Sequence, residues 1–394
     1  VSNSMSRREV CWGVFLAGLP FAHFVLWPSE LIDSYLSQNF WAYGGLAVLT
    51  AYGLWQPVAQ RVRNLPLALW LIWVVWGVIW TWKTVVQVHH LHPIDLLPPL
   101  VHTLGMVWFY QAAISQWTPA LLSRLFRWMA WSGLVIVLYG FLQLAGFDQF
   151  YRAIDLTKID ELMGTVGNPT HYGIHLALLL PIFLWQPAAW WKLVAAAAST
   201  LIVLTNSATA VVCGWLVWLW WGYHETSWVW LVLLVAGVLT GGWLLLTHSN
   251  WLNPEGRWSA WHAFWQHYFV GNNKLQLTGT SVGRMFSDSY AARPNWPLGW
   301  RHFHNEYLQV MVEHGVVGVG LLLWGIGDCL RRWWKLTPSP LTHTLAGIGM
   351  VFLLSSTLHF TTHLWVLASL GLMAYCGVYV LASETRVNVA NESG

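Results

Sequence analysis

Charged residues are scarce in this sequence, and only 9% of its 394 residues are Asp, Glu, Lys or Arg. Soluble globular proteins carry about 25%, so the composition excludes an ordinary soluble domain and indicates an integral membrane protein. Hydrophobic residues make up 56% of the chain, and the 33 Trp and 13 Tyr are of the kind that favours the membrane–water interface. The few basic residues form no stripe of the kind that binds nucleic acid. We therefore expect a lipid bilayer, and no nucleic acid, as a partner.

Cysteine and several nucleotide-binding signatures are also scarce or missing. The four cysteines all lie in apolar segments, so we expect small buried side chains rather than a disulfide framework. The sequence has no Asp-x-Asp pair to hold a divalent ion for a nucleotide-sugar donor. The segment 279–283 reads GTSVG but lacks the Lys and Ser/Thr that would complete a phosphate loop.

Long apolar runs are the main feature that is present. A helix needs about 20 mostly apolar residues to cross a bilayer, and twelve segments approach this requirement. The expected fold is therefore an all-α polytopic membrane protein with about 12 transmembrane helices. The first run follows Arg7 and Arg8 and lacks a cleavage site, so we expect a retained span rather than a signal peptide. The segments lie near 10–28, 39–59, 65–82, 97–117, 126–147, 170–187, 189–206, 208–223, 228–246, 307–328, 340–359 and 362–382.

The distribution of Lys and Arg predicts the orientation. Most of these residues fall in segments on the same side as the N-terminus, so the positive-inside rule places both termini in the cytoplasm. Two longer segments of this single membrane domain, 1–394, then lie outside: 148–169 and 247–306. Within the second, RWSAWHAFWQHYF (257–269) has the pattern of an interfacial amphipathic helix.

A polar cluster interrupts the apolar pattern at residues 301–318, which read RHFHNEYLQVMVEHGVVG. Ionisable groups are expensive to place in a membrane protein and are usually functional there. His304 is a candidate general base, because histidine titrates near working pH. Asn305 or His304 is expected to cap a helix that begins at Glu306, whose carboxylate would orient a histidine or accept a substrate hydroxyl. A satisfied hydrogen-bond network at a helix start is the simpler alternative.

The long outer segment also contains arginines whose planar forks suit phosphate. Above a membrane, they would suit the diphosphate of a lipid-linked donor, although scattered charges in a solvated loop would look the same. At the end of the other outer segment, Asn168 or His171 is predicted to face the cavity that would hold this donor. The chemistry of a tight turn alone would also explain the Gly-Asn-Pro sequence. Many histidines, His359 and His363 among them, map to the outer side. The basic residues of the long segment are Arg257, Lys274, Arg284, Arg293 and Arg301.

His89, His90 and His92 are of the residue type that binds metal ions. The HHLH sequence has only Asp95 nearby and lacks partners at diagnostic spacing. We therefore expect neither a metal ion nor another cofactor.

Three segments resemble the bacterial O-antigen ligase family, which includes lipopolysaccharide ligases, O-antigen polymerases and O-linked oligosaccharyltransferases. The segment GTVGNPTHYGIHLALLLPI (164–182) is similar to the family's turn into a span. Arg257 with the following WSAW and GTSVG resembles its Arg-x-x-x-Trp segment and Gly-rich bend. The specific match is HNEYLQVMVEHGVVGVG (304–320), which resembles the signature HN-x-YLQ-x-x-x-E-x-G-x-x-G. The likeness covers about residues 135–335.

The resemblance implies a GT-C-like fold in the bacterial inner membrane, with the active site facing the periplasm. It implies a glycan donor on undecaprenyl diphosphate, with His304 as the catalytic histidine and Arg257 as a diphosphate-binding residue. The motifs do not separate a ligase from a polymerase, and the twelve-span layout with one long late outer segment favours a ligase with a lipid A-core acceptor. TNSATA (205–210) lacks the Arg that the family often has, so a second phosphate contact falls to Arg284 or Arg301, or is missing. The expected site residues are the catalytic His304 and Glu306, with Arg257, Arg284, Arg301, Asn305, His302, Asn168 and Trp261 binding substrate.

Other functions remain open from the sequence alone. A polymerase or a protein O-oligosaccharyltransferase would use the same donor with another lipid-linked repeat or a protein Ser as acceptor. A lipid-glycan transporter would be expected to show broken helices and ionisable residues at mid-membrane depth, whereas the charges here gather in outer loops. Besides an enzyme and a transporter, the remaining class is a structural or binding subunit of a larger membrane assembly, with its Trp residues facing a partner.

Overall fold

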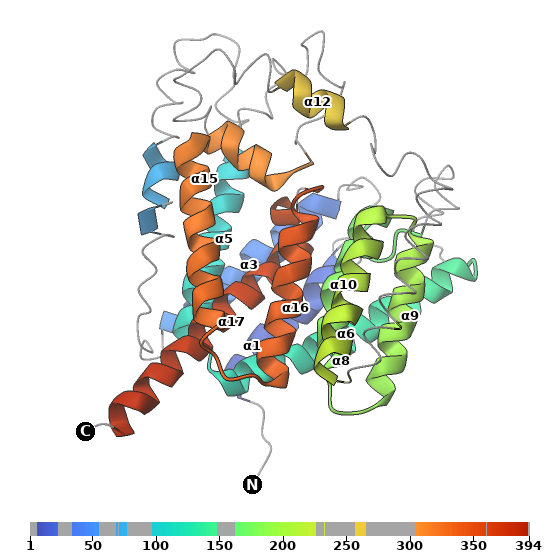
Figure 1. The fold of residues 1–394 in the computed structure, drawn as a ribbon, viewed down its shortest axis with the longest axis horizontal. Coiled ribbons are helices and arrows are strands. Elements are labelled where there is room, and N and C mark those ends of the chain that lie inside the picture. The colour runs from blue at the N-terminus through green and yellow to red at the C-terminus, as the bar shows by residue number, and fades with distance from the viewer. Residues whose placement is uncertain are drawn as a thin grey trace.

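The computed structural model describes residues 6–22, 34–54, 68–69, 71–76, 97–147, 162–225, 232, 257–264, 304–359 and 361–392. Within these ranges the chain is all-helical and has no strand, as the sequence predicts (Figure 1). Three of the described helices are long and apolar enough to cross a membrane, and three shorter apolar helices accompany them. The longer ones are Pro119–Leu144, Glu306–Trp333 and Trp365–Glu384.

Helices coincide with ten of the twelve predicted spans. Of the segment 65–82 only residues 68–69 and 71–76 are described, and 228–246 lies outside the described residues apart from position 232. The count of twelve spans stays a prediction. The helices are α1 (Arg7–Gly18), η1 (Leu19–Phe21), α3 (Ser34–Leu54), α5 (Leu97–Gln116), α6 (Pro119–Leu144), α8 (Pro169–Leu184), α9 (Trp190–Leu204), α10 (Ala208–Glu225), α12 (Arg257–Phe264), α15 (Glu306–Trp333), α16 (Pro340–Ser355), η8 (Thr361–His363) and α17 (Trp365–Glu392).

Three helices begin with the same local chemistry. Thr118, Asn168 and Ser339 each precede a proline at the first helical position. In each case the side-chain oxygen accepts a hydrogen bond of 3.2 Å from the backbone N–H three residues later. A polar cap satisfies a free N–H, and proline has no N–H to leave unsatisfied there. The local sequence therefore determines where these three helices begin.

Helix α8 is the central element of the bundle. All its side chains from His171 to Leu184 are buried, and it packs against α6, α9, α10 and α16. A helix that is apolar all round is typical of a core position. Since His171 lies in its first turn, α8 carries the buried core up to one end of the bundle.

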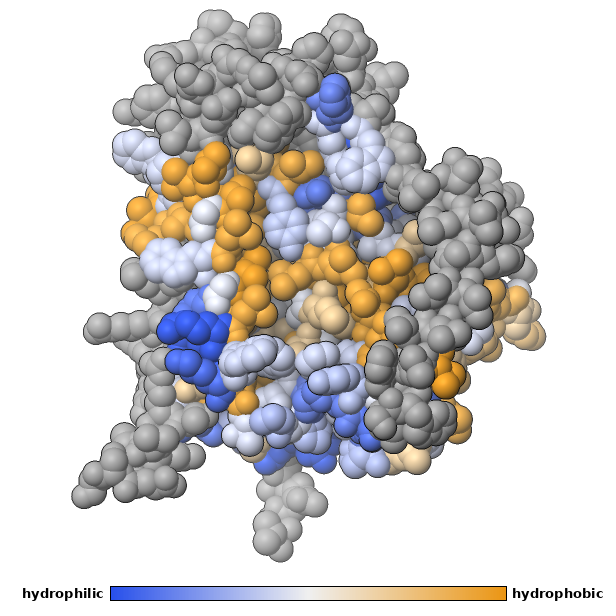
Figure 2. All heavy atoms as spheres, in the orientation of Figure 1, coloured by the Kyte–Doolittle hydropathy of each residue, from blue (hydrophilic) through white to orange (hydrophobic). Residues whose placement is uncertain are grey.

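Other helices present apolar side chains outward. Figure 2 shows such residues over α15 and α16 in the middle of one face, with hydrophilic residues at its lower edge. Soluble monomers rarely expose large contiguous apolar patches, whereas lipid requires them, so this surface suits a membrane protein. Exposed examples on α6 and α15 are Trp131, Val135, Leu138, Leu142, Val316, Leu323 and Trp324.

A sharp bend divides α15 at Gly315. Its φ of 64° and ψ of −169° fall in a region open essentially to glycine alone. The Nε1 of Trp73 donates a 2.9 Å hydrogen bond to the carbonyl of His314 beside the bend. Residues 306–314 consequently lie across the end of the bundle that also carries α12, and residues 316–333 run along it (Figure 1). The far end of α17 lies at the opposite end.

Candidate active site

Four basic side chains from four separate elements meet near α12. Arg257 opens α12, His304 precedes α15, His171 lies in the first turn of α8, and His359 follows α16. The ring centroids of His171 and His359 are 6.2 Å apart, and those of His304 and His359 are 6.4 Å apart. We call these four residues the basic cluster. His359 links the other two histidines within it.

The backbone fixes the position of His304. Its φ of 52° is left-handed, which costs a non-glycine residue of order 1–3 kcal/mol. The next residue, Asn305, caps α15 by accepting a 2.9 Å hydrogen bond from the N–H of Leu308. The N–H of Glu306 donates to the carbonyl of Ser356 at 2.8 Å. Of the two residues predicted as the cap, Asn305 is the one that caps α15. His304 therefore lies immediately before the helix.

Arg257 supplies a fixed positive charge beside His359. The side chain is buried, with only 5% of the residue exposed. Its Nη1 donates a 2.5 Å hydrogen bond to the carbonyl of Leu358, the residue before His359. The guanidinium brings a positive charge to this part of the site. A charge fixed in place before the reaction is the kind that stabilises developing negative charge.

His171 reaches the basic cluster through the Gly-Asn-Pro turn. The Oδ1 of Asn168 accepts a hydrogen bond from the backbone N–H of His171. Upstream, the Oε1 of Gln143 accepts from the N–H groups of Met163 and Gly164, at 3.0 and 2.8 Å. The turn thus anchors the start of α8 to α6. Of the two residues predicted to face the cavity, His171 lies in the cluster, and Asn168 caps the helix that carries it.

The electrostatics of the basic cluster favour an anion. Burial lowers the pKa of His359 well below its ordinary value, and the nearby Arg257, His171 and His304 lower it further. His171 in turn interacts electrostatically with His304 and Arg257. Within the part of the chain that the structure describes, the groups acting on His359 are thus all basic. A negatively charged ligand would offset the charge of Arg257 and make protonation of these histidines less costly.

Glu306 belongs to an adjacent network. Its Oε1 accepts a 2.6 Å hydrogen bond from the N–H of Thr362 and lies 3.2 Å from Nδ1 of His363. The Nε2 of His102 lies 2.6 Å from the carbonyl of Thr362, and its ring stacks on that of His363. The carboxylate therefore orients a histidine, as the sequence suggests, but that histidine is His363. The catalytic role of Glu306 stays a prediction.

We expect His363→Gln to lower the free energy of unfolding by about 1.5–3 kcal/mol near pH 6, the range for a hydrogen bond to a charged group. Burial lowers the pKa of His363, but the charge and hydrogen bond of Glu306, together with the charge of Glu313, raise it by more. A raised pKa stabilises the fold fully below the unfolded value of about 6.5, and the effect is lost as pH rises through the folded pKa. Unfolding measured at pH 6 and pH 9 should show a smaller loss at pH 9.

The control for this measurement is His224→Gln, which changes an exposed histidine in the last turn of α10. An equal loss of stability at both pH values for His363→Gln would contradict a charged pair between His363 and Glu306.

The remaining predicted residues are placed as follows. Trp261 lies on α12, with its ring edge-on to Trp258 at 5.0 Å. The helix predicted over 257–269 is described to residue 264. Arg284, Arg301 and His302 lie outside the described residues, as do the three histidines of HHLH. In the described ranges, no group of three His, Cys, Asp or Glu side chains is arranged to hold a metal ion.

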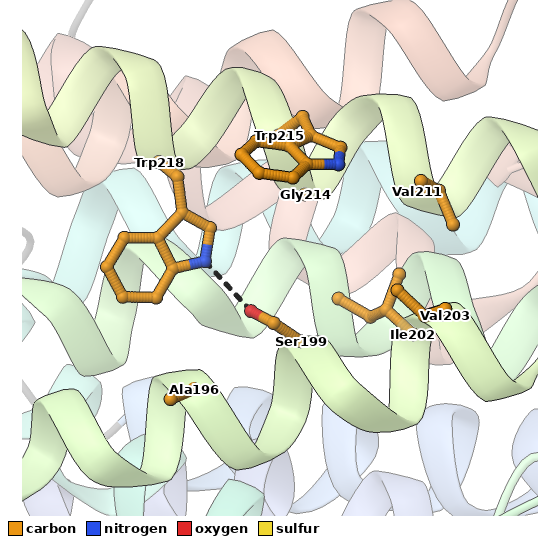
Figure 3. A pocket seen from close by; sticks show the side chains of 8 residues that line it. All are labelled: Ala196, Ser199, Ile202, Val203, Val211, Gly214, Trp215 and Trp218. Atoms are coloured by element: carbon orange, nitrogen blue, oxygen red, sulfur yellow. Dashed lines mark hydrogen bonds between the residues drawn. The ribbon is translucent and has the colours of Figure 1, made fainter. Parts of the chain in front are cut away.

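A hollow of about 390 Å³ lies elsewhere, between α9 and α10 (Figure 3). Its lining is apolar, apart from Ser199 and the indole groups of Trp215 and Trp218. Ser199 donates a hydrogen bond to the carbonyl of Ala195 and accepts one of 2.8 Å from Nε1 of Trp218. No titratable side chain lines the hollow. The basic cluster is therefore the better candidate for chemistry.

Comparisons with known proteins give no relative: no protein-family model matches the chain, and no curated protein matches it. The function is therefore inferred from the residues of the chain itself.

Proposed function

We propose that this chain is a metal-independent inverting glycosyltransferase of the O-antigen ligase kind, acting at the periplasmic face of the bacterial inner membrane. It moves a glycan from undecaprenyl diphosphate to an acceptor hydroxyl, most simply that of a lipid A-core sugar. The observation that carries the proposal is the meeting of Arg257 and His304 in a buried basic cluster at one end of an apolar helical bundle.

The proposed reaction is a single displacement at the anomeric carbon. His304 takes the proton of the acceptor hydroxyl as its oxygen attacks from the face opposite the diphosphate. The new carbon–oxygen bond forms while the bond to the phosphate oxygen breaks, and the electron pair leaves with the diphosphate. Arg257 stabilises the charge that grows on this leaving group. No metal is required, and the sequence has no Asp-x-Asp pair to hold one.

The arrangement of the bundle supports a lipid-linked donor. Such a donor must keep its hydrocarbon tail among apolar surfaces while its diphosphate lies at their edge. Exposed apolar residues cover α6 and α15, and the bend at Gly315 brings the start of α15 across the same end as α12. The Lys and Arg distribution predicts that this end faces away from the cytoplasm, which in the proposed setting is the periplasm.

The alternative functions fall into two classes, which differ in the chemistry expected at the site. A polymerase or a protein O-oligosaccharyltransferase would run the same chemistry on a different acceptor. A lipid-glycan transporter would bind the diphosphate but would have no hydroxyl proton for His304 to remove.

The experiment uses the full chain in lipid nanodiscs with a labelled oligosaccharide on polyprenyl diphosphate. Lipid A-core, a second lipid-linked repeat and a serine-containing peptide are offered separately as acceptors. We expect the label on lipid A-core, together with free polyprenyl diphosphate. Transfer to another acceptor would change the assignment within the enzyme class. Flux of the donor across proteoliposomes without a new glycosidic bond would contradict it.

A further inference from the structure

His359 has the central position in the basic cluster. The residue is 5% exposed, and its ring centroid lies 6.2 Å from that of His171 and 6.4 Å from that of His304. Its neighbour in sequence, Leu358, accepts the hydrogen bond from Arg257. The short connection between α16 and η8 therefore places an imidazole next to both residues of the proposed mechanism.

The charge balance around His359 is one-sided. The groups that act on it electrostatically come from three other elements: Arg257 from α12, His171 from α8 and His304 from the entry to α15. The carboxylate of Glu306 is engaged by Thr362 and His363. The guanidinium of Arg257 repels a metal cation and attracts an anion, and each imidazole that gains a proton offers a second N–H donor.

We propose that His359, with His171, binds the diphosphate of the lipid-linked donor beside Arg257, and that these imidazoles take up protons from solvent as it binds. The identity of the ligand rests on the proposed function. Linking the diphosphate to a lipid and a sugar leaves one acidic oxygen on each phosphate, so the donor itself does not titrate near neutral pH. Any pH dependence of its binding therefore belongs to the protein.

The proton uptake has an opposite effect on catalysis. The donor binds more tightly as pH falls, because more of the cluster is charged. Transfer needs His304 in its neutral form, and a fall in pH reduces the fraction of His304 that is neutral. We therefore expect KM for the donor and kcat to fall together as the medium becomes acidic.

The test is calorimetry on the full chain in nanodiscs, with a short polyprenyl diphosphosugar as the probe. Titrations in two buffers with different heats of ionisation measure the protons taken up. We expect affinity to increase from pH 8 to pH 6 by up to about tenfold per pH unit for each proton bound. For His359→Gln we expect a smaller uptake and a loss of affinity that is larger at pH 6 than at pH 8. His224→Gln, at an exposed position near the end of α10, should leave both unchanged.

Affinity that stays flat between pH 6 and pH 8 in the unmodified protein, with no proton uptake, would overturn the proposal whatever the variants do. Wild-type uptake in folded His359→Gln would overturn the role of His359. A nucleoside diphosphosugar carries the same diphosphate without the lipid. Weaker binding of this probe supports a lipid-linked ligand, and equal binding of the two overturns that choice.

The same preparations separate this inference from the proposed function. Glycan transfer without proton uptake would disprove the inference and leave the enzyme assignment in place. Proton-coupled binding of the probe without transfer to any acceptor would leave the anion site in place and disprove the enzyme assignment.

Discussion

Replacing His304 with asparagine is expected to slow glycan transfer by about 10²–10⁴-fold, the usual contribution of a positioned general base. The amide of asparagine cannot take up the hydroxyl proton. Asparagine is nevertheless one of the few residues that readily adopt the left-handed backbone found at this position. The substitution therefore removes the base without adding backbone strain, which alanine would add. Single-turnover transfer from a labelled donor measures the effect.

The control for this variant is donor binding by the same preparation. Because Arg257 and His359 are unchanged, the affinity for the polyprenyl diphosphosugar should stay within a few-fold of the unmodified protein. Unaltered transfer by folded His304→Asn would show that another group is the base. A loss of donor binding as large as the loss of transfer would place His304 in binding rather than in proton transfer.

Local patterns in the sequence predict much of the fold. The helix starts at Asn168 and Ser339 follow from a polar cap and a proline, and the start of α15 follows from Asn305. Such features depend on a few neighbouring residues, so one sequence is enough to predict them. The bend at Gly315 is not predicted from the sequence, although its positive φ explains why a glycine is needed there.

The candidate site is only partly predictable, because it is assembled by packing between distant segments. Arg257 and His304 were selected from motifs, and the structure brings both of them to His359. His359 itself lies in SSTLHFTTHLW (355–365), which has no motif that would single it out. Its only signal was a place on the predicted outer side. Glu306 was expected to orient a histidine, but nothing local indicates that this is His363.

Removing the charge of Arg257 is the other change with a large expected effect. We expect Arg257→Ala to lower kcat by about 10²–10³-fold, as for loss of one fixed group that stabilises transition-state charge. Arg257→Lys should lose less, because it keeps the charge but not the planar fork. The matched control is Arg331→Ala at the far end of α15, where the side chain is 61% exposed and its partner Asp328 keeps its bonds to Arg332 and Tyr379.

Arg257 also donates a hydrogen bond to Leu358, so its loss could act by loosening the turn that carries His359. The two effects have different consequences for His359. Without the guanidinium, one source of repulsion is gone, so the pKa of His359 rises toward its ordinary value and the imidazole takes up fewer additional protons when the donor binds. Reduced proton uptake together with reduced kcat in folded Arg257→Ala would identify electrostatics as the cause. Reduced thermal stability with normal kcat per folded molecule would mean that Arg257 only supports the turn.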